Sequence, residues 1–367
     1  MLILGIIILT VLTSGCQNAK DTRETQTQTQ EVKESETVSE DNTEANDDTK
    51  ASEESDLTSL DSIDYDLNPL TGMTQEKGTI ANRPLAIMFD NQYSARPQAG
   101  LIDADVAYEM LAEGLITRYM GIFYGNLPEH LGPIRSSRPY FLLKALEFNP
   151  FYVHVGGSMQ ALSDIKTYKM ADIDGLTSGA FHRESHKKIP HNMYSEAQTL
   201  INDGLKRGYD ESVEIDFLAF NPEFTPLVSD AQANEIKFVY KTPTSSDKTG
   251  YYTTYKYSEV QNFYYRYTNE DAHLDEDTGR QLFATNILVQ YVSQKVLDSE
   301  GRLELGLVGE GKGMYYTGGL GVEVTWKKAT VKDSTRFYNL DGNEIKLNPG
   351  KTWFQIMPKG SKEEIIR

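Results

Sequence analysis

The chain has 367 residues, a formal net charge of −18 and one cysteine. The acidic balance argues against a general nucleic-acid-binding protein, which needs a basic surface, and a single cysteine leaves no partner for an intramolecular disulfide. The globular part, roughly 300 residues, exceeds what one hydrophobic core normally serves, so two domains are expected.

Residues 1–16 have the features of a lipoprotein signal peptide. Met1 to Ser14 is uncharged and almost wholly apolar; it is too short to span a bilayer but has the length of a signal-peptide apolar region. The next residues complete LTSGC (12–16), which resembles the bacterial lipobox, although Thr13 replaces the usual Leu. A signal peptide normally begins with a positively charged region, but no Lys or Arg precedes this apolar run. A start a few residues upstream of Met1 would account for that difference. We expect Cys16 to be lipidated.

Residues 17–66 are predicted to be a disordered acidic tether. This segment contains 16 acidic and 4 basic residues, which accounts for −12 of the net charge of −18. It carries too little apolar surface to offset the entropy of ordering the chain. A flexible coil of this length spans on the order of 40 Å, so it holds the folded part away from the membrane.

Residues 67–215 are predicted to form an N-terminal mixed α/β sandwich domain. Buried or paired strands are expected at 83–91, 105–114, 117–125 and 151–155. Helical spacing follows Pro139 and recurs in MQALSDIKTY (159–168) and in SEAQTLINDGLKRG (195–208). The predicted fold class is therefore α/β, in the mixed α+β sense.

Residues 216–233, with two prolines, are predicted to connect this domain to a smaller, antiparallel β-rich domain at 234–367. Short alternating runs broken by Gly, Asn and Asp are typical of such a sheet. Its many aromatic residues favour a sheet core over a glycan-binding face. DEDTG (275–279) is a poor calcium loop, since Gly279 stands where a ligand belongs, and is read as a turn.

Several motifs together resemble one bacterial family. They are NPLTG, NRPLAIMFDN, ARPQAGL, ADVAYE, EGLITRYMGIF, GPIRSSRPYF, HVGGS and PHNMY, followed by NILVQ, GEGKG, TWKK and NPGKTWFQI. In order, over nearly all of residues 67–358, they are similar to the YerB-like lipoproteins of Gram-positive bacteria. The resemblance implies an extracytoplasmic, lipid-anchored protein of two domains, and implies no particular activity.

The sequence contains two patterns that resemble those of catalytic residues. Ser158 follows a strand and a tight turn, as in a nucleophile elbow, with His154 and His191 as candidate bases, but the G-x-S-x-G pattern fails at Gln160. Ser158 is equally well placed to cap a helix. Ser-x-x-Lys occurs twice and Lys-Thr-Gly once, but chance accounts for matches this short and no Ser-x-Asn lies between them.

Five of the six histidines lie between His130 and His191. In HRESH, His182 and His186 would share one face of a helix, as metal ligands often do. Gly179 and Pro190 make a long helix there unlikely to form. We therefore expect no metal and no other cofactor.

The stretch GPIRSSRPYF (132–141) presents two arginines at an expected helix start, with Ser137 as its cap and Pro139 in the first turn. Arginine is unfavourable at that end of a helix. Two explanations remain open. Arg135 and Arg138 pair with acids, of which Asp90, Glu109 and Glu113 are nearest in the predicted strands, or they bind an anion. The ligand-binding residues predicted for the second case are Arg96, Arg118, Arg135, Ser136, Ser137, Arg138, Gly157, Ser158 and Asn192.

The resulting functional hypothesis is a membrane-anchored lipoprotein on the extracytoplasmic face of the cell membrane. It binds or scaffolds an anionic ligand, a wall component or another envelope protein, and not nucleic acid. The alternative is a hydrolase or transferase acting on wall material through Ser158 or a histidine-rich site. An enzyme requires Ser158 within hydrogen-bond reach of a histidine that a carboxylate orients.

Overall fold

The computed structural model describes residues 64–113, 116–242, 250–361 and 363–366. The predicted signal peptide, Cys16 and all but the last residues of the predicted tether lie outside these ranges. Residues 61–367 group as one compact unit. In the described part of the chain, no helix is both long and apolar enough to cross a membrane.

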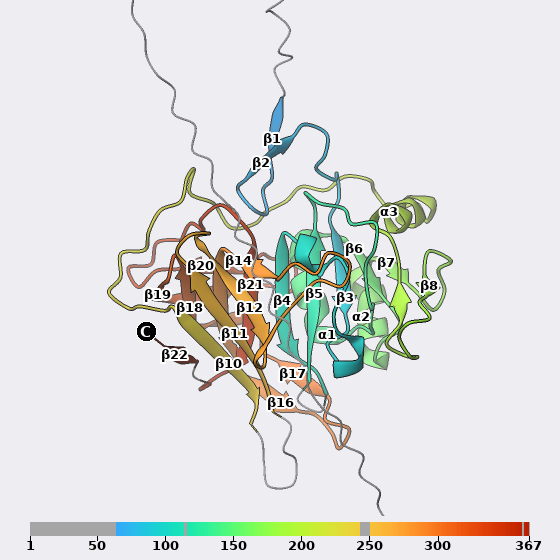
Figure 1. The fold of residues 1–367 in the computed structure, drawn as a ribbon. Coiled ribbons are helices and arrows are strands. Elements are labelled where there is room, and N and C mark those ends of the chain that lie inside the picture. Colours follow the sequence, from blue (N-terminus) through green and yellow to red (C-terminus); the bar gives the residue numbers. More distant parts are fainter. Residues whose placement is uncertain (1–63, 114–115, 243–249, 362, 367) are drawn as a thin grey trace, which may run out of the picture. The chain divides into compact units, whose positions relative to one another are not determined.

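A ten-stranded mixed sheet contains strands from both halves of the chain (Figure 1). Its order is β20-β19-β18-β15-β21-β4-β5-β3-β6-β7. The N-terminal half supplies β3 (Leu85–Phe89), β4 (Val106–Leu111), β5 (Thr117–Phe123), β6 (Phe151–His154) and β7 (Ala171–Asp174). The C-terminal half supplies β15 (Asn286–Val292), β18 (Gly309–Thr317), β19 (Leu320–Lys328), β20 (Arg336–Tyr338) and β21 (Thr352–Pro358). The two halves meet where β21 runs parallel to both β15 and β4.

A second sheet is wholly antiparallel. It contains β10 (Glu235–Lys241), β11 (Tyr251–Ser258), β12 (Phe263–Thr268), β13 (Asp271–Ala272), β14 (Phe283–Ala284) and β22 (Glu364–Ile366). Buried and half-buried residues alternate along β10, as expected when one face of a strand packs on a core. From β11, the Tyr255 ring meets the edge of Trp353 in β21 at 6.4 Å, so this sheet packs against the ten-stranded one.

Three short pairs of strands complete the β structure described. They are β1 (Tyr65–Leu67) with β2 (Thr74–Glu76), β8 (His182–Arg183) with β9 (Met193–Tyr194), and β16 (Gln294–Val296) with β17 (Leu303–Leu305). The last pair forms a hairpin that packs against the first α-helix.

The described α-helices are α1 (Pro139–Ala145), α2 (Met159–Tyr168) and α3 (Ala197–Lys206), and α1 continues into the 3-10 turn η4 (Leu146–Phe148). Ser158 caps α2, because its hydroxyl accepts a hydrogen bond from the Ala161 amide at 3.2 Å. Pro139 begins α1, as predicted, but the cap prediction for Ser137 is wrong. Arg138 occupies the cap position, and the Ser137 hydroxyl instead bonds the Tyr152 hydroxyl at 2.7 Å.

Strand β4 is buried on both faces, because its side chains alternate between two cores. Tyr108 stacks on Phe354 at 4.6 Å on the face that η4 covers. Its neighbour Glu109 points to the opposite face and is fully buried against the second sheet. The two cores on either side of β4 are therefore formed by contacts between residues far apart in the sequence.

The predicted strands at 83–91, 105–114, 117–125 and 151–155 correspond to β3, β4, β5 and β6. Among the residues that the structure describes, 41% lie in strands and 13% in helices, so the fold is more strongly β than the α/β label suggests. The antiparallel character expected of the C-terminal half holds for the second sheet. It does not hold for β15 and β21, which pair in parallel inside the sheet of the N-terminal half.

Candidate functional site

Arg135 forms an ion pair with an acidic residue, which is the first of the two explanations given for the arginines at this helix start. Its Nε lies 3.3 Å from Oδ2 of Asp90, which also accepts a hydrogen bond from Nδ1 of His191 at 2.7 Å. The Asp90 side chain is almost fully buried and Arg135 is half-buried. Arg135 and His191 thus hold one buried carboxylate, and His191 is committed to that contact.

Arg138 forms a two-pronged ion pair with Glu113. Its Nε and Nη2 bond the two carboxylate oxygens, the latter at 3.0 Å. Burial opposes the charged form of Glu113, but the Arg138 hydrogen bond and charge outweigh it and lower the pKa of Glu113. The predicted partners Asp90 and Glu113 are therefore confirmed. Glu109 is not a partner of either arginine; its carboxylate pairs with Arg266.

Arg118 lies behind this pair. Its Nη1 donates to the Ser136 carbonyl at 2.8 Å, and its Nη2 lies 3.7 Å from Glu113. Burial, followed by the charge of Arg138, lowers the pKa of Arg118 to about 10, although Glu113 acts in the opposite direction. Two guanidinium groups therefore share one carboxylate, which leaves an excess of positive charge.

A small pocket opens beside Arg138. It has a volume of about 210 Å³ and lies between the starts of α1 and α2 and the β16–β17 hairpin. Its lining includes two ion pairs, Arg138 with Glu113 and Arg302 with Asp298, and the residues Tyr140 and Ser158. We call it the Arg138 pocket. Two of the predicted ligand-binding residues, Arg138 and Ser158, are brought together here.

Tyr140, one of the residues that line this pocket, has a buried hydroxyl without a partner among the described residues. Tyr140 is 3% exposed, and its hydroxyl makes no hydrogen bond with any residue that the structure describes. Burial, reinforced by the charge of Glu113, raises the pKa of Tyr140, so the hydroxyl keeps its proton. A buried hydroxyl without a partner costs free energy, and this one still has its hydrogen available to donate.

Sequence reasoning missed Arg302 and Tyr140. Arg302 belongs to the hairpin, where its Nε bonds Asp298 at 2.5 Å and its side chain stays 42% exposed. Tyr140 reads as one apolar position of a helix, and nothing in the local sequence indicates that its hydroxyl lacks a partner. Only the packing of the hairpin against α1 places both beside Arg138.

The remaining predicted ligand residues lie apart from this pocket. Arg96 donates to the Asn91 side chain at 2.9 Å and lies over the Tyr251 ring. Gly157 pairs its backbone with Ser137, whose side chain is fully buried. Asn192 accepts from Arg183 at 2.6 Å and donates to the Glu184 carbonyl, so it braces the β8–β9 pair.

The catalytic arrangement required of an enzyme is not seen in the described part of the chain. Ser158 acts as a helix cap. His154 is fully buried; its Nδ1 lies 2.8 Å from the Gly156 carbonyl and its Nε2 lies 2.7 Å from Asp172. Both ring nitrogens therefore face acceptors, and no hydrogen bond to Ser158 is found among the described histidines.

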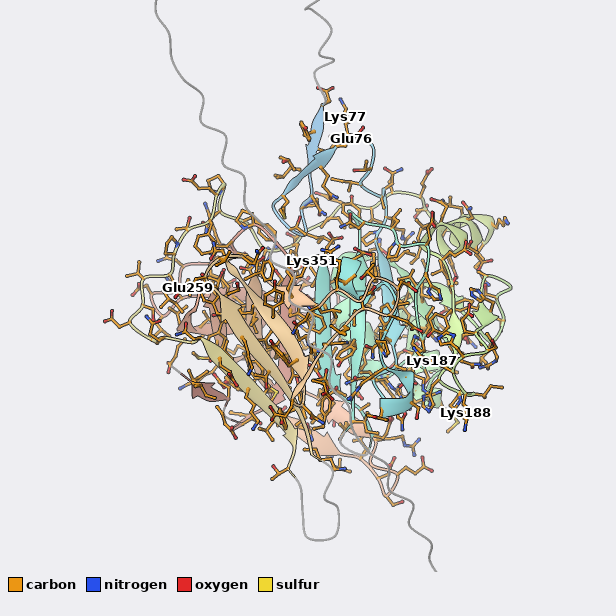
Figure 2. All side chains as sticks on the ribbon, viewed as in Figure 1. Glu76, Lys77, Lys187, Lys188, Glu259 and Lys351 are labelled. Carbon is orange, nitrogen blue, oxygen red and sulfur yellow. The ribbon has the colours of Figure 1, made fainter. Side chains whose placement is uncertain are left out.

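A second hollow of about 480 Å³ includes Phe224, Phe263 and Phe283 in its lining. Its polar groups bond one another: the Asn68 amide donates to Gln75 and to Asp105, at 2.9 and 3.0 Å. Lys351, labelled in Figure 2, also lines it and donates to a backbone carbonyl at 2.9 Å. This hollow is larger than the Arg138 pocket, and Asn68, Asp105 and Lys351 in its lining already have partners.

The fold defines a class: a mixed-sheet protein whose two halves share one sheet and whose surface carries an arginine-lined pocket. Residues 70–210 match the family model described as "Protein of unknown function (DUF3048) N-terminal domain", and residues 242–354 match the model of its C-terminal domain. The chain belongs to this family.

Two comparisons with Bacillus subtilis proteins agree. The chain is 31% identical over 297 residues to a protein of strain 168 named "Putative lipoprotein YerB", covering 79% of this chain and 86% of that one. The crystal structure of YerB protein from Bacillus subtilis matches with a TM-score of 0.73 and 29% identity, over 82% of this chain and 99% of that one. The family resemblance read from the motifs is thereby confirmed.

Proposed function

We propose that the chain is a lipid-anchored envelope protein that binds an anionic ligand in the Arg138 pocket and does not transform it. The observation that carries this proposal is the unpartnered, buried Tyr140 hydroxyl beside Arg138 and Arg302. The name of the Bacillus subtilis relative supports the anchor. The ligand class follows from the pocket chemistry alone.

The pocket offers several donors to one small group. Arg138 and Arg302 contribute the guanidinium N–H groups that their partners Glu113 and Asp298 leave unused, and guanidinium groups bind carboxylates and phosphates. Ser158 uses its oxygen as the α2 cap, which leaves its O–H free to donate. With Tyr140, these groups surround a volume suited to a phosphate or carboxylate at the end of a larger wall component.

The pocket is tested by substituting Arg302 with Ala and measuring the binding of glycerol phosphate by calorimetry. Losing one charge-assisted hydrogen bond is expected to weaken binding by about 10-fold or more. The melting temperature should hardly change, because the exposed Arg302–Asp298 pair contributes little to stability. Arg207→Ala is the matched control, since Arg207 forms the same i,i+4 pair with Asp203 outside the pocket.

Tyr140→Phe separates binding from folding. It removes only the unpartnered hydroxyl, so the protein should be as stable as the parent or slightly more so, while glycerol phosphate binding falls several-fold. If wild-type protein does not bind glycerol phosphate, inorganic phosphate or acetate, or if Arg302→Ala and Tyr140→Phe both bind as well as wild type, the proposal is wrong.

The anchor is tested at Cys16. In cells grown with labelled palmitate, the wild-type chain should incorporate label and sediment with membranes, whereas Cys16→Ala should do neither. The reason is that Cys16 is the chain's one cysteine and directly follows the apolar segment. Equal labelling of both forms would rule out acylation at this residue.

A further inference from the structure

A cluster of nitrogen and oxygen ligands lies where the β8–β9 pair meets the loop around His130. One ligand atom each from His130, His182 and Glu184 all lie within 4.8 Å of one another. Nε2 of His182 is 2.9 Å from Oε1 of Glu184, and Nε2 of His130 is 4.0 Å from the same oxygen. The three side chains are 28–48% exposed, so a metal ion has access from solvent.

HRESH (182–186) does not form a helix, in line with the argument from Gly179 and Pro190. His182 lies in β8 and His186 in the turn that follows, so the two do not share a helical face. The second histidine of the cluster is instead His130, more than fifty positions earlier in the chain. The sequence analysis expected no metal, and the spacing within HRESH gives no indication of a group that includes His130.

His130 is held as metal-binding histidines commonly are. Its Nδ1 bonds the Asp277 carboxylate at 2.9 Å, which directs Nε2 toward Glu184. Its ring stacks on Tyr194 at 4.7 Å with an interplanar angle of 18°. A carboxylate on the far nitrogen fixes the tautomer and orientation of a metal-bound imidazole.

Glu184 is also fixed by its backbone. Its N–H donates to the Asn192 carbonyl at 3.0 Å, and its carbonyl accepts from the Asn192 amide at 2.8 Å. Asn192, predicted from the sequence to bind a ligand, thus positions a residue of this cluster. His182 and Glu184 are two positions apart in an extended segment, so their side chains point to the same face of the strand pair.

We propose that His130, His182 and Glu184 bind one zinc ion, with a fourth position open to water or to an external ligand. Two imidazoles and one carboxylate suit zinc, and a tetrahedral site with ligands at 2.0–2.1 Å separates ligand atoms by about 3.3 Å. The separations of 2.9 and 4.0 Å lie on either side of that value. Small side-chain movements would close the site.

The site would join the two halves of the chain. Asp277, behind His130, belongs to the DEDTG turn of the C-terminal half, and the adjacent Glu276 bonds Lys187 at 2.6 Å and Tyr194 at 2.8 Å. Lys187, labelled in Figure 2, follows β8 in the chain. A metal at Glu184 would therefore lock the β8–β9 pair, the His130 loop and this turn together. The site shares no residue with the Arg138 pocket, so it stands independently of the proposed function.

The test is zinc binding by the full chain, measured by competition with a chromogenic chelator. All forms carry Cys16→Ala, which removes the one thiol of the chain. We expect one zinc per wild-type chain. His130→Ala and Glu184→Ala should each weaken binding by at least about 100-fold, and Asp277→Asn, which leaves every ligand in place, by about 10-fold. His191→Gln is the control, because His191 contacts Asp90 and not the cluster.

Two further readouts keep the test decisive. Cobalt in place of zinc should give the intense visible absorption of a four-coordinate site in wild type and not in His130→Ala. Zinc should raise the melting temperature of wild type and of His191→Gln but not of the ligand variants, with circular dichroism showing that all are folded. Absence of stoichiometric zinc from wild type, or unchanged affinity in both His130→Ala and Glu184→Ala, would overturn the proposal.

Discussion

Replacing Glu109 with Gln is expected to lower the free energy of unfolding by about 3–5 kcal/mol, because it breaks a buried ion pair and leaves a charge without its partner. Oε2 of Glu109 lies 2.7 Å from Nη2 of Arg266, and both side chains are fully buried. The other carboxylate oxygen accepts from Thr117 at 2.7 Å and from Tyr251 at 2.5 Å. Every part of this carboxylate is thus satisfied by protein groups from both sheets.

Arg266 connects the pair to a second layer of hydrogen bonds. Its Nη1 donates to Nδ1 of His273, whose Nε2 then donates to the Gln98 side chain at 2.7 Å. Burial, and then the charge of Arg266, lowers the pKa of His273, so the ring is neutral and can accept from Arg266. Losing the Glu109 charge leaves Arg266 facing a neutral histidine and hydroxyl groups only.

Urea unfolding followed by tryptophan fluorescence measures the effect, since Trp353 lies against the Arg266 guanidinium. Glu310→Gln is the control, because Glu310 and Lys327 form an exposed pair worth little. Combining Glu109→Gln with Arg266→Met should cost less than the sum of the two single changes, since the double variant leaves no buried charge unpaired. A loss below 1 kcal/mol for Glu109→Gln would show that water or another group compensates the charge.

This pair also shows what local sequence could and could not reveal. The strand containing Glu109 was predicted correctly, since an apolar alternating run identifies it. A glutamate inside such a run signals a buried partner, yet the sequence pointed to the nearby Arg135 and Arg138. The true partner is 157 positions away. Only the packing of one sheet on the other brings Arg266 to Glu109, and local patterns carry no information about that packing.

Only some residues of the Arg138 pocket could be predicted from the sequence, again because local patterns carry no information about tertiary packing. Arg138 and Ser158 begin helices, so cap and dipole rules singled them out. Glu113, the acidic partner of Arg138, lies two residues after the end of β4 and was also within reach of local reasoning. Arg302 comes from a hairpin whose position depends on tertiary packing. Tyr140 was correctly read as a helix residue, but whether its hydroxyl has a partner depends on every neighbour at once.

Alkaline pH should unfold the protein cooperatively between about pH 11 and 12, through its buried tyrosines. Burial is the largest cause that raises the pKa of Tyr108, Tyr152, Tyr240, Tyr251 and Tyr255, all of which lie above the ordinary value of 10. In the unfolded chain these hydroxyls ionise normally, whereas in the folded chain they stay protonated. Their contribution to stability is therefore complete below pH 10 and is lost as the pH rises.

The expected loss of stability is comparable to the whole stability of a typical protein. One pH unit above 10, each of the five tyrosines favours the unfolded state by about 1.4 kcal/mol, or about 7 kcal/mol in total, against a typical stability of about 5–15 kcal/mol. Lys144 opposes this below pH 10.5, because burial lowers its pKa to about 8, but its effect does not grow further once the unfolded lysine also loses its proton.

Circular dichroism and tyrosinate absorbance, recorded on the same samples, should change together. Tyr108→Phe removes one buried ionisable hydroxyl and should move the midpoint to higher pH, whereas Tyr93→Phe, at an 82% exposed position, should leave it unchanged. Ionisation of the buried tyrosines near pH 10 while circular dichroism still reports a folded chain would contradict the prediction. It would mean that the cores around these tyrosines admit hydroxide without unfolding, and that the Glu109–Arg266 pair, which Tyr251 contacts, lies in a wetter core than its contacts indicate.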